Sequence, residues 1–180
     1  MQSIYFVDSN FTYESSKKSI LSIRYATDGF SFCVHDETEK LVVFVHEPYA
    51  ADSREAVVAK LKNYVVNDTI LNLRFKKVYI MPCFKEKLLV PGAFFDKANI
   101  ATLYTVNQEV SPDDTILYHH IEGIEAYLVE TVISSFHDFV REHFPVVQIV
   151  NGAYPFILGA MSKALRDTEQ IFLDLSLIHI

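Results

Sequence analysis

Residues 19–49 read SILSIRYATDGFSFCVHDETEKLVVFVHEPY, and this stretch decides the fold. Three apolar runs are separated by two polar turns, one at Asp28-Gly29 and one at residues 37–40. Asp-Gly between alternating apolar runs predicts a tight hairpin, because Gly tolerates the positive φ that such a turn needs. Alternate positions such as Ile23 and Phe32 then share one face of the pleat. The stretch therefore predicts a three-stranded meander with one buried face.

Downstream of the meander, the pattern predicts alternating helices and strands. Pro48 ends strand pairing because it has no amide hydrogen, and Asp52 with Glu55 forms a capping-box-like helix start. Apolar residues then recur at helical spacing around Leu61. Further on, the sequence predicts strands at 77–83, 115–121, 124–132, 146–150 and 170–180, and helices over about 96–105, from Ser134 or Ser135 to Pro145, and from Pro155. This order indicates a mixed α/β fold.

The composition limits the classes of function. The chain has 180 residues, half of them hydrophobic, which suffices for a packed core. Its formal net charge is -7, which argues against nucleic acid as a partner, because phosphate binding needs clustered Lys and Arg. No apolar run approaches the length of a membrane span, and the N-terminus lacks a basic signal-peptide region. Cys33 and Cys83 read as buried free thiols. We therefore expect a cytoplasmic protein without membrane contact.

The common catalytic and cofactor motifs are missing. His119 and His120 are adjacent, so on a strand they point to opposite faces and cannot hold one metal ion together. The first meander strand lacks the carboxylates of a two-metal nuclease, and neither a G-x-S-x-G elbow nor a glycine-rich phosphate loop occurs. We predict no catalytic residue, no metal site and no cofactor.

The segments LSIRYATDGFSFCVHDETEKLVVF, KLLVPGAFFD, HFPVVQIVNGA and IFLDL resemble an uncharacterised bacterial family, a domain of unknown function assigned an actin-like ATPase fold, which is related to the ribonuclease-H-like fold. The resemblance covers about residues 17–175. The apolar run Ile4–Val7 and the polar residues after it predict an N-terminal arm or edge strand at 1–16. The resemblance implies an actin-like first subdomain at 17–166. Residues 167–180 would be the first strand of a truncated second subdomain. With nothing to pair with, this apolar strand would fold back as an edge strand or drive self-association.

The actin-like resemblance also implies where a nucleotide would bind. Two hairpins of that fold hold the phosphates, each with an acidic residue, a Gly and then a hydroxyl residue. Here the matching residues of the first hairpin are Asp28, Gly29 and Phe30, with Ser31 one position later. The acid of the second hairpin is Asp174, which is followed by Leu175 instead of Gly.

Three functions remain open at this point. Because Phe30 replaces the hydroxyl, we favour a non-catalytic interaction or scaffold protein with degenerate nucleotide motifs and an unidentified protein partner. The alternatives are a protein whose full-length form binds ATP and Mg²⁺ as an actin-like ATPase, and an unrelated ligand-binding α/β domain. Phe30 and the missing Gly after Asp174 separate the first two in favour of the first.

Overall fold

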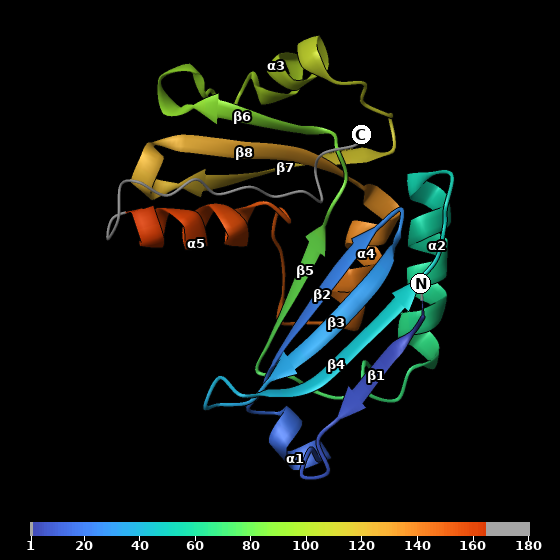
Figure 1. Ribbon diagram of the computed structural model, residues 1–180. Coiled ribbons are helices and arrows are strands. Elements are labelled where there is room, and N and C mark those ends of the chain that lie inside the picture. Colours follow the sequence, from blue (N-terminus) through green and yellow to red (C-terminus); the bar gives the residue numbers. More distant parts are fainter. Residues whose placement is uncertain (1, 165–180) are drawn as a thin grey trace. The chain divides into compact units, whose positions relative to one another are not determined.

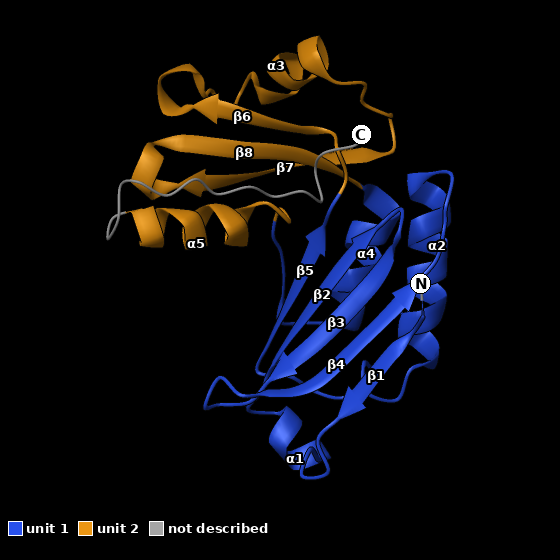
Figure 2. Ribbon diagram, viewed as in Figure 1, with its two compact units in different colours: residues 1–83, 133–150 blue, residues 84–132, 151–180 orange. Residues whose placement is uncertain are grey.

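The computed structural model describes residues 2–164 and is shown in Figure 1. The chain folds as two compact units, coloured separately in Figure 2. Unit 1 is formed by residues 1–83 and 133–150, and unit 2 by residues 84–132 and 151–180. The predicted strand at 170–180, the predicted domain 167–180 and Asp174 lie outside the described residues.

Unit 1 is a six-stranded mixed sheet with helices. Its elements are β1 (Ile4–Val7), α1 (Tyr13–Ser16), β2 (Ile20–Ala26), β3 (Gly29–His35), β4 (Leu41–Pro48), α2 (Arg54–Asn67), β5 (Lys77–Pro82), α4 (Ser134–His143) and β9 (Val147–Ile149). The strand order is β1-β4-β3-β2-β5-β9. The predicted meander is confirmed as β2, β3 and β4, which pair antiparallel. Strand β5 pairs parallel to β2, and β9 parallel to β5.

One face of this sheet is the core of unit 1. Leu21, Ile23, Phe32 and Val34 are at most 1% exposed, as the alternation along the strands predicts. Helix α2, at the right of the sheet in Figure 1, contributes the buried side chains Val57, Val58, Leu61 and Val65. Helix α4 adds Phe136, whose ring meets that of Tyr25 edge-on at 5.1 Å. The apolar face predicted around Leu61 is therefore confirmed for α2.

Two predicted helix caps were wrong. The N-cap of α2 is Ser53, whose hydroxyl accepts a hydrogen bond from the Ala56 amide, and not Asp52. Ser and Asp are equally good caps, so the sequence alone could not separate two neighbours. Helix α4 begins directly after a strand with Ile133 at its N-cap and no side-chain cap. Neither Ser134 nor Ser135 has the role predicted for it.

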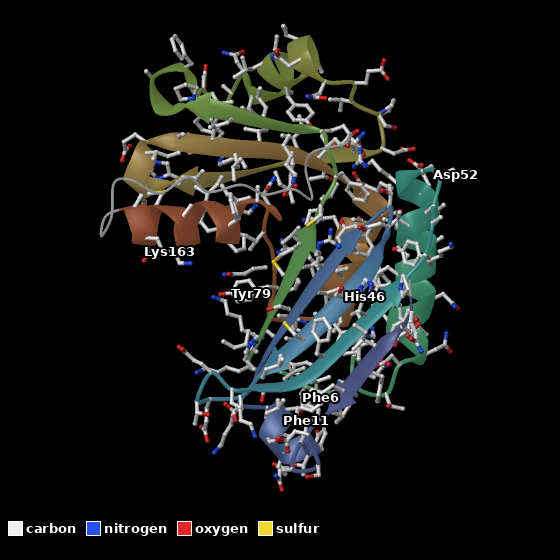
Figure 3. The ribbon with its side chains drawn as sticks, in the orientation of Figure 1. Phe6, Phe11, His46, Asp52, Tyr79 and Lys163 are labelled. Carbon is white, nitrogen blue, oxygen red and sulfur yellow. The ribbon has the colours of Figure 1, made fainter. Side chains whose placement is uncertain are left out.

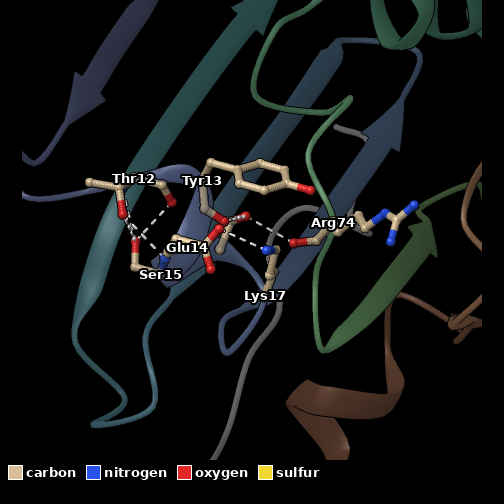
Figure 4. Close-up of polar contacts among 7 residues, drawn as sticks. Thr12, Tyr13, Glu14, Ser15, Lys17 and Arg74 are labelled. Carbon is tan, nitrogen blue, oxygen red and sulfur yellow. Dashed lines mark hydrogen bonds and ion pairs between the residues drawn. The ribbon is translucent and has the colours of Figure 1, made fainter.

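The N-terminal residues 1–16 contain an edge strand and a short helix. Strand β1 pairs antiparallel with β4. Helix α1 begins at a reciprocal capping box between Thr12 and Ser15, drawn in Figure 4. The Ser16 hydroxyl at its end donates to the Arg74 carbonyl at 2.9 Å. The segment is thus tied to the body of unit 1 by hydrogen bonds at both ends.

Unit 2 contains a three-stranded sheet in the order β6-β8-β7. Its elements are β6 (Lys87–Pro91), the 3-10 turn η1 (Gly92–Phe94), α3 (Ile100–Asn107), β7 (Asp114–Ile121), the 3-10 turn η2 (Glu122–Ile124), β8 (Ala126–Ile133) and α5 (Tyr154–Ala164). The predicted strand pair around Glu122-Gly123 is confirmed as neighbours β7 and β8. Strand β6 was not predicted, and α3 begins four residues later than expected.

The core of unit 2 is smaller and rich in aromatic rings. Val90, Ile100, Tyr104 and Val129 are the buried members of one cluster in it, and Ile121, Leu128 and Val132 are also buried. Phe95 stacks on Tyr127 with ring centroids 3.6 Å apart. None of the residues of α5 is buried. Across residues 2–164, no helix has the length and apolar character needed to cross a membrane.

Candidate functional site

The candidate site is the turn between β2 and β3 and the open hollow beside it. The turn residues are Thr27 and Asp28, since Ala26 pairs directly with Gly29. The hollow is bordered by these two residues and by the segment from Pro48 to Ala51 that leads from β4 toward α2. All of these residues belong to unit 1. This is where the resemblance to actin-like proteins places a phosphate.

Gly29 is needed here for the backbone of unit 1 itself. Its φ is +147°, a conformation that residues with a Cβ rarely adopt. A Cβ at this position would lie 2.6 Å from the Glu47 carbonyl oxygen. The glycine thus allows β4 to approach the hairpin closely, which accounts for its presence without a ligand.

The Asp28 carboxylate lies beside a cation. One of its oxygens is 3.6 Å from a guanidinium nitrogen of Arg24, which is four residues earlier on β2. The Asp28 side chain is 61% exposed, so the pair is solvated and contributes little to stability. In an actin-like phosphate hairpin the carboxylate arranges a metal-bound water. Here the positively charged Arg24 side chain lies beside it instead.

Phe30, at the position where the fold's phosphate hairpins carry a hydroxyl, is a core residue. It is 3% exposed, and its ring meets that of Tyr64 on α2 edge-on at 4.4 Å. The ring of Tyr49 lies 6.0 Å away. The side chain therefore points into the helix-covered core, and no hydroxyl at residue 30 faces the hollow.

Ser31 points to the opposite face of the sheet, where it meets a histidine. Its hydroxyl is 2.8 Å from Nδ1 of His46 on β4. The strand register places Arg24, Ser31 and His46 in one row across β2, β3 and β4. We did not predict this row from the sequence. The turn lies at Thr27-Asp28, one residue earlier than the predicted Asp28-Gly29, so the predicted register would not have placed Arg24 opposite Ser31.

The backbone of the turn is also engaged. The carbonyl oxygens of Thr27 and Asp28 accept hydrogen bonds from the amides of Ala51 and Tyr49, at 3.1 and 3.2 Å. The Lys60 ammonium lies 4.7 Å from the centre of the Tyr49 ring and donates to the Ala50 carbonyl. Burial raises the pKa of Tyr49 to about 12, and the nearby Asp28 carboxylate adds to this. The wall of the hollow is thus fixed to the turn.

The adjacent residues His119 and His120 lie on strand β7 and point to opposite faces, as predicted. His119 lies on β7 with its ring 6.1 Å from that of Tyr154, and burial lowers its pKa. His120 stacks on Tyr127 at 4.6 Å and lies 3.5 Å from the Glu125 carboxylate. Within residues 2–164, no three His, Cys, Asp or Glu side chains are grouped so that they could hold a metal ion.

Comparison with protein families finds one matching family for this chain. The model of the family described as "Protein of unknown function (DUF3822)" matches residues 8–178. No curated protein matches the sequence. Among solved structures, the chain is similar to a Bacteroides thetaiotaomicron protein described as having an actin-like ATPase fold and unknown function, with a TM-score of 0.76 and 24% identity.

That similarity covers 86% of this chain and 60% of the Bacteroides thetaiotaomicron protein. The chain therefore spans three fifths of the length of this structural neighbour. The predicted family and fold class are confirmed: this is an α/β protein with the actin-like ATPase fold. Neither comparison carries a catalytic role.

Proposed function

The chain belongs to the DUF3822 family, and we propose that it is a non-catalytic interaction or scaffold protein built on an actin-like fold. Its proposed partner is another protein chain, with no cofactor and no nucleic acid involved. The cytoplasmic location predicted from the sequence stays a prediction.

The observation that carries this proposal is what Asp28, Gly29 and Phe30 contact in the first hairpin. Asp28 faces Arg24, and Gly29 accommodates the Glu47 carbonyl. Phe30 fills the core. A phosphate site needs free amides, a hydroxyl and a carboxylate available to a metal-bound water. At this turn Phe30 replaces the hydroxyl and Arg24 lies beside the carboxylate, which favours a fold kept for binding over one kept for ATP hydrolysis.

Isothermal titration with ATP and Mg²⁺ tests the proposal directly. We expect no saturable heat up to millimolar nucleotide, both for the chain as it is and for Asp28→Ala. The matched control is Glu37→Ala, which removes an exposed carboxylate from the next turn of the meander. Saturable binding that is lost in Asp28→Ala and retained in Glu37→Ala would overturn the proposal in favour of the ATP-binding alternative.

A further inference from the structure

The two long helices of unit 1 pack on the same face of its sheet. Helix α4 packs there through Phe136, whose ring meets that of Tyr25, and α2 packs there through Tyr64. The strand register and the alternation along each strand give the opposite side, which we call the open face, the residues Phe6, Arg24, Ser31, His46, Lys77 and Tyr79. None of these six side chains is buried, and Phe6, His46 and Tyr79 are labelled in Figure 3.

The charged side chains that the strands place on the open face are cations. Arg24 lies on β2 and Lys77 on the neighbouring strand β5. The imidazoles of His35 and His46 lie on the same face. None of the residues of β1 to β5 or of β9 that alternate onto this face is an Asp or Glu. In a chain with a formal net charge of -7, this face therefore favours an anionic partner.

Arg24 is the cation of this face whose donors lack an acceptor. Within residues 2–164 its guanidinium makes no hydrogen bond, and its ion pair with Asp28 is 3.6 Å long, beyond hydrogen-bond distance. The Arg24 side chain is only 32% exposed, so water reaches a minor part of it. A guanidinium carries five N–H donors in a planar fork that fits the two oxygens of a carboxylate. The geometry therefore leaves room at Arg24 for a carboxylate from outside the chain.

Polar and aromatic groups flank Arg24 in two neighbouring rows across the sheet. In its own row Ser31 follows and then His46, whose Nδ1 is 2.8 Å from the Ser31 hydroxyl. A hydroxyl that donates to Nδ1 leaves the ring proton on Nε2, which is then a donor. The next row contains Phe44 on β4 and Tyr79 on β5. A polar row beside an aromatic row fits a segment in which acidic and apolar residues are close together.

We propose that the open face binds an acidic segment of another protein, with an Asp or Glu carboxylate of that segment held by the Arg24 guanidinium. Apolar residues beside that carboxylate pack on Phe44 and Tyr79. This proposal rests on the proposed function as an interaction protein and names the binding surface and the chemistry of the partner. Asp28 is then a competitor, because its carboxylate lies beside the same guanidinium.

An acidic protein segment fits this face better than a nucleic acid does. Binding along a phosphate backbone uses many clustered Lys and Arg, whereas the strands of this sheet place Arg24 and Lys77 on the open face. A single carboxylate needs one guanidinium. At physiological ionic strength, charges more than about 8 Å away are largely screened, so the acids elsewhere on the chain do not prevent a local contact with Arg24.

Fluorescence anisotropy with a short labelled peptide in which Glu alternates with Leu tests the binding. Two further probes control for charge and for the class of partner: the same peptide with Gln in place of every Glu, and a labelled oligothymidylate. We expect saturable binding of the Glu peptide alone. In nuclear magnetic resonance spectra of the unaltered chain, that peptide should shift the amide signals of β2, β3 and β4 and leave those of unit 2 unchanged.

Substitutions at the ion pair test the role of Arg24. Arg24→Gln should weaken binding of the Glu peptide roughly ten- to a hundredfold, the range expected for a lost hydrogen bond to a charged group. Arg24→Lys keeps the charge without the fork and should weaken it by a smaller factor. Asp28→Ala should tighten binding, because it removes the competitor. The control is Arg141→Gln, which removes an exposed guanidinium from α4 and should bind as the unaltered chain does. Circular dichroism checks that the variants are folded.

The outcomes separate this inference from the proposed function. Equal binding of the Glu and Gln peptides, an unchanged affinity in folded Arg24→Gln, or a preference for oligothymidylate overturns the inference. Should Arg24→Gln not fold, the comparison of the two peptides and the amide shifts of the unaltered chain still decide. A chain that binds neither ATP nor the Glu peptide refutes the inference alone. ATP binding that is lost in Asp28→Ala refutes the proposed function, whatever the peptide does.

Discussion

The two units of this chain differ in how many apolar side chains their helices bury. In unit 1, α2 contributes four buried apolar side chains, and the facing strands are almost fully covered. In unit 2, α3 contributes two, Ile100 and Tyr104, and α5 contributes none. Because buried apolar area is the main favourable term in folding, we expect unit 1 to be the more stable of the two. The meander that decides the fold also carries the larger core.

The largest expected effect comes from a cavity in the core of unit 1. Leu61 is 1% exposed in the middle of the buried face of α2. Leu61→Ala should lower the free energy of unfolding by about 2–5 kcal/mol, through lost burial and the cavity left behind. The matched control is Val66→Ala on the same helix, where the side chain is 56% exposed and the change should be within about 0.5 kcal/mol.

Denaturant melts give both numbers, and hydrogen exchange tests the comparison between the units. Amides of unit 1 should lose protection in Leu61→Ala more than those of β7 and β8 do. Equal destabilisation by the two substitutions would mean that the α2 core does not dominate unit 1.

Two glycines, one in each unit, should respond with opposite signs. Gly29→Ala forces a Cβ into a backbone with φ of +147°, at 2.6 Å from the Glu47 carbonyl oxygen. Backbone strain of this kind amounts to about 1–3 kcal/mol, and the close contact adds to it. Gly159 lies within α5, and a Cβ there meets nothing within 4 Å. Gly159→Ala should stabilise the helix by about 0.5–1 kcal/mol. Thermal melts that shift in the same direction for both would contradict the geometry.

The elements that sequence reasoning predicted correctly are those set by local chemistry. The Asp-Gly pair and the alternation around Phe32 are short-range signals, and β2 to β4 follow from them. The turn itself lies at Thr27-Asp28, one residue earlier than the predicted Asp28-Gly29. Strand β6 was missed because Pro91-Gly92 reads as a break in the chain. Its partner β8 lies more than thirty residues later, with Val90 opposite Tyr127. A single apolar run does not reveal a partner at that distance.

For the candidate site, the sequence identified residues but not their neighbours. Asp28, Gly29 and Ser31 were singled out as phosphate candidates; Asp28 lies in the turn, Gly29 begins β3 and Ser31 lies within that strand. That Ser31 meets His46, and that the Glu47 carbonyl approaches Gly29, depends on the register between β3 and β4. The register shifts between Val34 and His35, and such an irregularity has no short sequence signature.

A smaller loss of stability is expected from a substitution at the buried tyrosine of unit 2. Tyr104 is fully buried, and its hydroxyl donates to the Glu86 carbonyl at 2.8 Å. Tyr104→Phe keeps the ring and removes that hydrogen bond, so we expect a loss of about 0.5–1.5 kcal/mol. Tyr5→Phe, at a side chain that is 65% exposed, is the matched control. A loss confined to the amides of unit 2 in hydrogen exchange would show that its core unfolds separately from that of unit 1.

The smallest expected effect is a pH dependence from His119 in unit 2. Burial lowers the pKa of this histidine below its ordinary value of 6.5, so the folded chain holds the ring neutral. In the unfolded chain the ring takes up a proton near pH 6.5, and the folded chain resists that proton. The free energy of unfolding should therefore be at its full value above pH 6.5 and decrease as the pH falls toward the folded pKa.

His119→Gln should flatten this decrease when denaturant melts at pH 7.5 and 5 are compared. The matched control is His120→Gln, because that side chain lies on the opposite face of β7 beside Glu125. If both variants flatten the slope equally, the burial of His119 is not its cause.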